Sequence, residues 1–113
     1  PYQLQEVLEC LVRNALEAME NNAAPPRIKL QVLLLQRYVS INIGNNGTPI
    51  ARKQWNAIFD PFYTTKSTKS NWGLGLALCR NVVSLHRGRI WVDEEPDRGV
   101  MMTVFHIVLR NAD

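Results

Sequence analysis

The sequence predicts an α+β fold, a two-layer α/β sandwich in which a mixed, mostly antiparallel sheet carries helices on one face. Three observations predict it. The chain has 113 residues, of which 46% are hydrophobic and 20% charged, as in an ordinary globular protein. Apolar residues recur at helical spacing in two segments, and each of these precedes two segments with strand-like alternation. We therefore expect residues 1–113 to form a single domain.

The first helix and the first hairpin are expected before residue 44. Asn21-Asn22 and Pro25-Pro26 end the helix. Segments 28–35 and 39–43 alternate as strands, and the short connection between them predicts an antiparallel hairpin. Residues 44–49 are rich in turn formers and predict a loop. The helix is expected over residues 4–20, on an apolar stripe of Leu4, Val7, Leu8, Leu11, Ala15, Ala18 and Met19.

The middle of the chain predicts a short helix, a polar loop and a second long helix. Residues 54–59 favour a short helix that Pro61 ends. Residues 63–72 are rich in Ser, Thr and Lys and indicate a mobile surface loop. The second helix is expected from residue 73 to about residue 86, with Gly88 at its C-terminal cap.

A second hairpin is expected near the end of the chain. Its strands are predicted at 89–92 and 100–109, joined by an acidic turn over 94–99. We interpret the acidic group around this turn, which begins at Asp93, as a solvated tip. Both histidines, His86 and His106, are interpreted as structural residues that cap or pack.

Charge and cysteine usage exclude several classes of protein. The 13 Lys and Arg residues against 10 Asp and Glu residues give a net charge of only +3, which does not indicate a nucleic-acid-binding protein. Cys10 and Cys79 have neither zinc-ligand spacing nor the number a disulfide scaffold needs. No apolar run approaches the roughly 20 residues that span a bilayer, so we expect no direct membrane contact. We expect the chain to work in a reducing cytoplasm.

Asn14 is the first residue whose position calls for a chemical explanation. Steps of three and four residues from Val7 reach Leu11, Asn14 and Ala18, so the amide lies along the apolar stripe. A polar group there needs a partner. On the residues alone, a hydrogen bond to a neighbouring loop is favoured. The alternative is an oxygen ligand for a hard cation such as Mg²⁺.

The start of the second helix is a candidate anion site. A polar, glycine-containing loop leads into it, and free N–H groups at a helix N-terminus bind anions. Lys66 and Lys69 precede it and could reach phosphate oxygens, or they could simply be solvated. Gly73 and Gly75 could equally serve only to allow tight helix packing.

The loop at residues 44–49 holds a second candidate group. Asn45 or Asn46 could present a donor and an acceptor to the edge of a heterocycle. The alternative is that these residues only form the exit loop of a hairpin.

Together these segments resemble the ATP-binding catalytic domain of bacterial sensor histidine kinases, within the GHKL (Bergerat-fold) ATPase superfamily. The resemblance covers essentially the whole chain, and four motifs occur in the family's order. They are the N box at 11–18, the first glycine box at 45–50, the F box at 58–66 and the second glycine box at 73–78.

The resemblance implies ATP and Mg²⁺ as ligands. It makes Asn14 the Mg²⁺ ligand and, with Lys66, a catalytic residue, and it makes residues 63–72 the lid over ATP. It implies that the hydroxyl of Thr103 helps to bind adenine. The implied nucleotide contacts are Arg13, Asn45, Gly47, Ile50, Phe59, Lys66, Lys69, Gly73, Leu74, Gly75, Leu76 and Thr103.

Several positions depart from the family pattern. Asn45 stands where Asp is usual, while Pro49 and Met101 replace glycines of the glycine boxes. Cys10 occupies a position that is usually polar or acidic. Because a neutral amide lacks the charge assistance of a carboxylate, these departures predict weaker nucleotide binding.

The resemblance implies that the domain binds Mg·ATP and donates the γ-phosphate to a histidine on a separate dimerisation domain of the same protein. A response regulator would then act downstream, and the protein would be cytoplasmic or the cytoplasmic part of a membrane-anchored sensor. We expect the chain to be a fragment that lacks the acceptor histidine. Two alternatives remain open: an ATP-hydrolysing GHKL ATPase, which Cys10 disfavours, and a degenerate docking module without nucleotide.

Overall fold

The computed structural model describes residues 2–61, 63 and 72–110 of the chain. Two helices and four strands form its framework, with two short 3₁₀ turns between β2 and α2. The elements are α1 (Tyr2–Ala18), β1 (Ile28–Leu34), β2 (Tyr38–Asn45), η1 (Arg52–Gln54), η2 (Ala57–Phe59), α2 (Trp72–Leu85), β3 (Arg89–Asp97) and β4 (Val100–Arg110).

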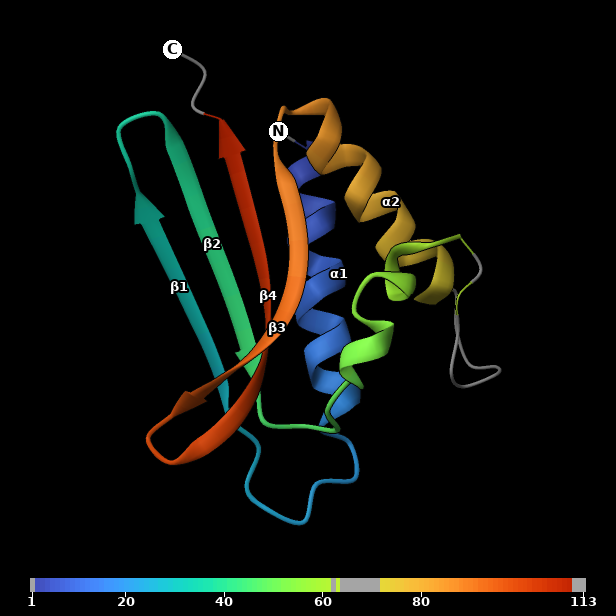
Figure 1. Cartoon of the computed structure of the whole chain (residues 1–113), viewed down its shortest axis with the longest axis vertical. Helices are drawn as coiled ribbons and strands as arrows, with labels where there is room; N and C mark the ends of the chain where they lie inside the picture. Colours follow the sequence, from blue (N-terminus) through green and yellow to red (C-terminus); the bar gives the residue numbers. More distant parts are fainter. Residues whose placement is uncertain (1, 62, 64–71, 111–113) are drawn as a thin grey trace.

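The four strands form one sheet in the order β1-β2-β4-β3, and every pairing is antiparallel. Both helices lie on one side of this sheet and run in opposite directions, as Figure 1 shows. α1 lies against β2 and α2 lies against β3. The predicted two-layer fold is therefore confirmed, and every strand pair in the described part of the chain is antiparallel. Neither helix has both the length and the apolar character that crossing a bilayer requires.

The core lies between the helices and the inner face of the sheet. Leu11 of α1, Val83 of α2 and Ile107 of β4 are almost completely buried there. Phe59 of η2 packs edge-on against Phe105, with ring centroids 6.2 Å apart. Burial of these apolar side chains is the main force that holds α1 and α2 on the sheet. β1 lies at the edge of the sheet, and all of its residues are exposed.

The middle of the chain differs from the sequence prediction in two places. β2 continues through Gly44 and Asn45, which were predicted to be loop. The reason is that the ladder to β4 continues, with Gly44 opposite Val104 and Asn45 opposite Thr103. The predicted helix over 54–59 is wrong as a single element, because η1 and η2 are separate short turns.

The second hairpin is longer than predicted. β3 runs to Asp97, so the residues assigned to an acidic turn are mostly strand. The hairpin closes through Arg98 and Gly99, whose φ angles of +54° and +80° suit a tight two-residue turn. The turn signal lay in these last two residues, while the acidic residues before them occupy the edge strand.

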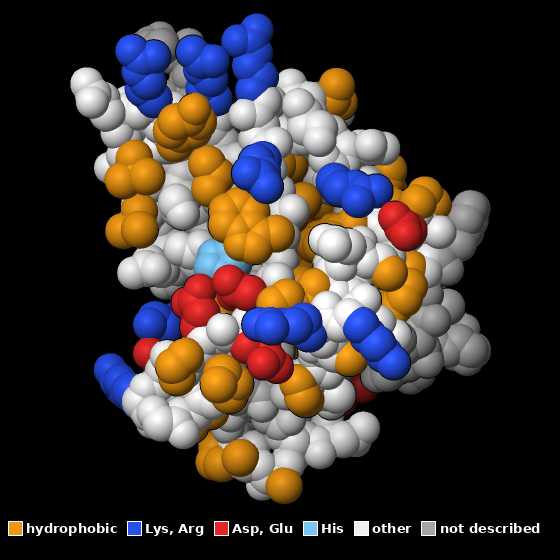
Figure 2. Space-filling model, viewed as in Figure 1, with side chains coloured by type: hydrophobic (Ala, Val, Ile, Leu, Met, Phe, Trp, Pro, Cys, Tyr) orange, Lys and Arg blue, Asp and Glu red, His pale blue; other side chains and the backbone are white. Residues whose placement is uncertain are grey.

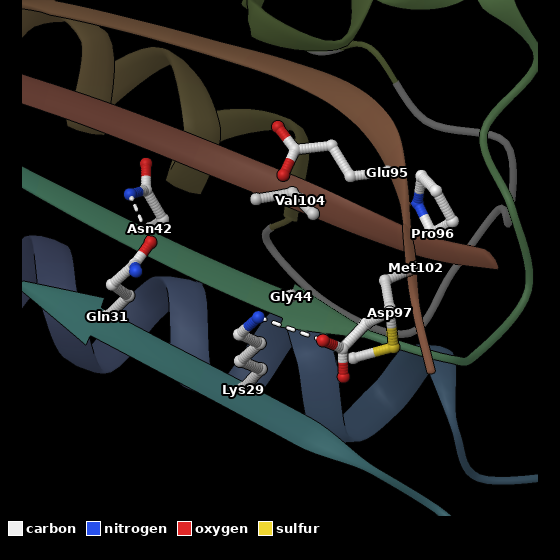
Figure 3. Close-up of a pocket in the computed structure, with 9 residues that line it drawn as sticks. All are labelled: Lys29, Gln31, Asn42, Gly44, Glu95, Pro96, Asp97, Met102 and Val104. Atoms are coloured by element: carbon white, nitrogen blue, oxygen red, sulfur yellow. Dashed lines mark hydrogen bonds and ion pairs between the residues drawn. The ribbon is translucent and has the colours of Figure 1, made fainter. Parts of the chain in front are cut away.

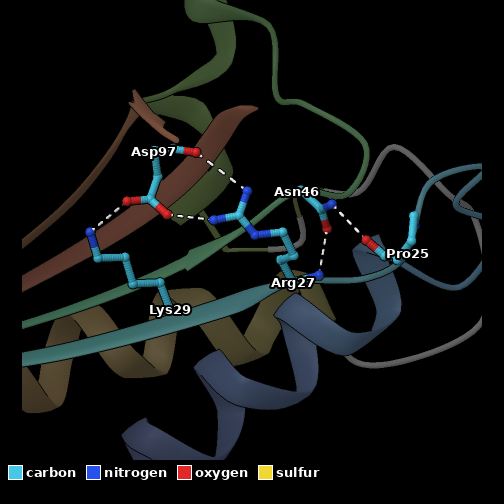
Figure 4. A network of polar contacts seen from close by, with 5 residues as sticks. All are labelled: Pro25, Arg27, Lys29, Asn46 and Asp97. Atoms are coloured by element: carbon cyan, nitrogen blue, oxygen red, sulfur yellow. Dashed lines mark hydrogen bonds and ion pairs between the residues drawn. The ribbon is translucent and has the colours of Figure 1, made fainter. Parts of the chain in front are cut away.

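An ion-pair cluster ties β1 to the turn of the second hairpin. The Asp97 carboxylate accepts hydrogen bonds from Arg27 at 2.6 Å and from Lys29 Nζ at 2.9 Å (Figure 4). The hydrogen bond from Lys29, with the positive charges of Lys29 and Arg27, holds the pKa of Asp97 below its ordinary value. The cluster therefore links β1, at one edge of the sheet, to the end of β3, at the other edge.

Replacement of Asp97 by Asn should lower the melting temperature at about pH 7. The size of this decrease should depend on pH. A carboxyl whose folded pKa is depressed stabilises the fold above its unfolded pKa of about 3.9, and this contribution disappears as pH falls through the folded pKa. The difference between wild type and Asp97→Asn should therefore shrink toward zero in acid, as measured by circular dichroism. Asp60→Asn, which removes a weaker 3.7 Å contact to Arg80, is the matched control. A difference that did not change with pH would contradict this interpretation.

Candidate functional site

Two polar side chains are buried beside the apolar core. Asn45 is 2% exposed and Thr103 is 4% exposed, and they are the buried polar residues of the part of the chain that the structure describes. They lie directly opposite each other on β2 and β4. Buried polar groups are unfavourable without partners, so such a pair at the edge of a core marks a candidate binding position. The structure thus brings two sequence-predicted site residues together.

The loop after β2 folds back onto the end of α1. The backbone N–H of Gly47 donates to Asn45 Oδ1 at 2.8 Å, and the N–H of Thr48 donates to the carbonyl of Ala18 at 2.9 Å. A Cβ on Gly47 would lie 2.3 Å from that same carbonyl oxygen. Gly47 is therefore required because the loop backbone touches α1, and this contact links Asn45 to the helix that carries Asn14.

Asn46 has a structural role. Its Oδ1 accepts from the backbone N–H of Arg27 at 2.8 Å and from Asn22 Nδ2 at 3.2 Å. Its own Nδ2 donates to the carbonyl of Pro25 at 2.9 Å (Figure 4). These bonds hold the segment between α1 and β1, so of the two asparagines left open by the sequence, Asn45 is the one at the candidate site. Asn22 shares this role through its long-range contact with Asn46, 24 residues along the chain, which residue types alone do not reveal.

Asn14 is a half-buried residue of α1. Cys10, one helical turn before it, has its Sγ 3.2 Å from the place that a Cβ on Gly75 would take. The two helices run in opposite directions (Figure 1), so the turn of α1 after Cys10 lies toward the beginning of α2. Asn14 and the N-terminal end of α2 are therefore on the same side of the molecule.

The first turn of α2 combines a packing role with a possible binding role. Gly75 allows the close approach of α1, because a Cβ there would crowd Cys10. Leu76 is buried in the core. The backbone of Gly73 and Leu74 lies in the first turn, whose N–H groups have no partners within the helix. The packing interpretation of Gly75 is thus supported, and the backbone of this turn still provides donors for an anion.

The remaining predicted site residues differ in their exposure to solvent. Arg13 is exposed, and Ile50 is half-buried against the core. Phe59 is 3% exposed, so its ring fills the core beneath the site and offers no surface to a ligand. Lys66 and Lys69 lie outside the described residues.

The chemistry of these groups fits a magnesium nucleotide. Asn14 offers an amide oxygen of the kind that Mg²⁺ accepts. Asn45 and Thr103 offer hydrogen-bonding groups that suit the edge of a base.

The two cysteines meet at the same helix contact. A hydrogen bond from Cys79 lowers the pKa of the Cys10 thiol; burial opposes this shift and the positive charge of Arg13 assists it. The pKa of Cys79 is raised by its hydrogen bond to Cys10 and by burial. Cys10 is therefore the more easily ionised thiol.

Iodoacetamide should alkylate Cys10 before Cys79, because the thiolate is the nucleophile and Cys79 is buried. Peptide mass spectrometry over a time course measures both rates. Cys79→Ala should slow the alkylation of Cys10, since it removes the hydrogen-bond donor, whereas Cys79→Ser keeps a donor and serves as the control. Equal rates in these two variants would contradict the assigned role of Cys79.

Comparison with known proteins matches the chain to one family. The family described as histidine kinase-, DNA gyrase B-, and HSP90-like ATPase matches residues 1–111. Adaptive-response sensory kinase SasA of Rippkaea orientalis is 34% identical over an alignment of 109 residues that covers 89% of this chain and 27% of SasA. Alginate biosynthesis sensor protein KinB of Pseudomonas aeruginosa is 35% identical over 97 residues, 86% of this chain and 16% of KinB. The chain spans about a quarter or less of these curated relatives.

Solved structures agree with this match. The catalytic domain of histidine kinase ThkA superposes with a TM-score of 0.78 and 31% identity, over 96% of this chain and 66% of that one. The mycobacterial sensor histidine kinase MprB gives a TM-score of 0.82 over 96% of this chain and 72% of that one. At 24% identity, MprB supports the fold alone.

Proposed function

The chain belongs to the histidine kinase-, DNA gyrase B-, and HSP90-like ATPase family, and we propose that it is the Mg·ATP-binding catalytic domain of a sensor histidine kinase. In this proposal residues 1–113 form one domain that donates the γ-phosphate of ATP to a histidine. That histidine belongs to a dimerisation domain of the same cytoplasmic or membrane-anchored protein, and a response regulator is the next acceptor. The observation that carries the proposal is the buried pair of Asn45 and Thr103 beside the loop that joins them to α1.

Asn45 and Thr103 would bind the base. The hydrogen bond from Gly47 to Asn45 Oδ1 fixes the orientation of the amide. The remaining hydrogen-bonding groups of the amide and the hydroxyl of Thr103 would then meet the polar edge of adenine. A rigid pair of this kind selects a base by its donor and acceptor pattern, because a mismatched edge leaves buried polar groups unpaired.

The first turn of α2 and Asn14 would hold the phosphates. The N–H groups around Gly73 and Gly75 supply donors and the positive end of the helix dipole. Asn14 would hold the cation through its amide oxygen. When bound, Mg²⁺ neutralises charge on the phosphates during transfer. In this proposal Lys66 and Lys69 add positive charge near the phosphates, and Arg13 contributes from the surface of α1.

Hydrolysis of ATP by the chain alone is disfavoured. A water-activating base one turn before Asn14 would have to be Cys10, whose Sγ is packed against α2. The neighbouring Glu9 is exposed and accepts a hydrogen bond from Gln5, so it faces away from the helix contact. We therefore propose phosphoryl transfer to a partner domain rather than steady turnover. A docking module without nucleotide is the other alternative, and titration with nucleotide separates it.

Asn14→Ala should abolish Mg²⁺-dependent binding of a non-hydrolysable ATP analogue, because the cation loses its protein ligand. Isothermal titration calorimetry measures this, and circular dichroism checks that the fold is intact. Asn21→Ala, at an exposed position just after α1, is the matched control and should bind as the wild type does. Wild-type protein without binding heat at millimolar analogue would instead favour the docking module. An unchanged affinity in Asn14→Ala would remove Asn14 from the site.

Asn45→Asp should tighten ATP binding about fivefold, since a carboxylate makes a charge-assisted bond with the adenine amino group that is worth about 1 kcal/mol more. The same titration measures it. Asn46→Asp is an informative contrast, because it loses the hydrogen bond to Pro25 and should lower stability without improving affinity. Weaker binding in Asn45→Asp would mean that the amide group of Asn45 donates to the ligand.

A further inference from the structure

The outer face of the sheet carries a second polar cluster, away from the helices. His106 Nε2 lies 2.7 Å from Asp93 Oδ1 and 3.2 Å from Glu95 Oε2. Among the described residues these three form a group whose ligand atoms all lie within 4.8 Å of one another. Figure 2 shows a histidine side chain bordered by acidic side chains on the surface. The interpretations of His106 as purely structural and of the acidic residues as a solvated tip are therefore incomplete.

The histidine ring is held in one orientation by its other contacts. His106 Nδ1 lies 2.7 Å from Asn42 Oδ1, and Asn42 Nδ2 donates to Gln31 Oε1 at 3.3 Å. The Asn42 oxygen is thus an acceptor, so Nδ1 carries the proton and donates. The indole of Trp91 stacks on the ring with centroids 5.0 Å apart. In the neutral ring the lone pair of Nε2 is therefore directed at two carboxylates.

Three electron-rich atoms that converge in this way favour a positive charge between them. Among the described residues no Lys or Arg forms an ion pair with Asp93 or Glu95, and Arg27 and Lys29 are bound by Asp97. The His106 side chain is 12% exposed, whereas the two carboxylates are more accessible. Asn42 and Glu95 also line a surface hollow beside the cluster (Figure 3). A cation could therefore enter from water.

We propose that Asp93, Glu95 and His106 form a binding site for a divalent transition-metal ion, with Zn²⁺ as the best fit. One imidazole nitrogen and two carboxylate oxygens are common zinc ligands, and a ligating histidine usually donates its other ring N–H to an oxygen acceptor, which here is Asn42 Oδ1. Bonds of about 2.0 Å at tetrahedral angles place ligand atoms about 3.3 Å apart. The contact between His106 and Glu95 already has this spacing, and Asp93 must withdraw by roughly half an ångström. Mg²⁺ should bind poorly, because it prefers six oxygen ligands.

Titration of the chain with ZnCl₂ tests the site by calorimetry at neutral pH. We expect one zinc ion to bind and to raise the melting temperature. Glu95→Gln should weaken binding by at least about tenfold, since an amide is a poor zinc ligand. Glu94→Gln is the matched control, because Glu94 is the adjacent residue of β3 and its side chain lies on the other face of the sheet. This control should bind zinc as the wild type does.

Spectra of His106 separate this site from other occupants. Zinc should shift the imidazole nitrogen resonances of His106 in the wild type and in Glu94→Gln, and in Glu95→Gln it should shift them only at zinc concentrations at least about tenfold higher. Zinc captured by the thiols of Cys10 and Cys79 would bind equally to both variants without moving His106, and this result would overturn the proposal. Resonances that respond only to acid would also overturn it, because a proton would then be the sole occupant. Nucleotide binding is measured separately, so either proposal can fail alone.

Discussion

The candidate site depends on two glycines that allow other segments to pack closely against α1. Gly75 lets the first turn of α2 approach Cys10, and Gly47 lets the loop after β2 rest on the carbonyl of Ala18. A helix held in this way brings the amide of Asn14 to the side where α2 begins. Larger residues at either glycine would separate elements that are distant in sequence, so the geometry depends on backbone contact more than on any single hydrogen bond.

The two faces of the sheet carry separate groups of polar residues with different roles. On the inner face, Asn45 and Thr103 form a polar position within an apolar layer. On the outer face, Asn42 links Gln31 to His106, and this row of polar contacts reaches β3. Because side chains alternate along strands, neighbouring residues of β2 belong to different sites. Ligands on the two faces need not compete.

The sequence alone predicts the layers of the fold, because helical and strand periodicity are strong over α1, α2 and β4. It also placed Thr103 on a strand, but it assigned Asn45 to a loop, whereas the ladder to β4 continues through this residue. The residue types alone could not separate Asn45 from Asn46, although the family resemblance implied Asn45; the contacts of Asn46 with Arg27 and Pro25 show that its amide is structural. The sequence placed the acidic residues in a turn, whereas they extend β3. The hairpin is closed by Arg98 and Gly99, and the residue pattern did not reveal the positive φ angles of these two residues. Strand register then decides which of the acidic residues meet His106.

The central claim is that Asn14 and the first turn of α2 bind one ligand between them. The most direct measurement is a ¹H–¹⁵N spectrum of the chain with Mg²⁺ and a non-hydrolysable ATP analogue. We expect joint shifts of the Asn14 side-chain amide and of the backbone amides of Gly73, Gly75 and Gly47, with little change at His106. Shifts confined to the outer face of the sheet, or shifts in α2 without any at Asn14, would contradict it.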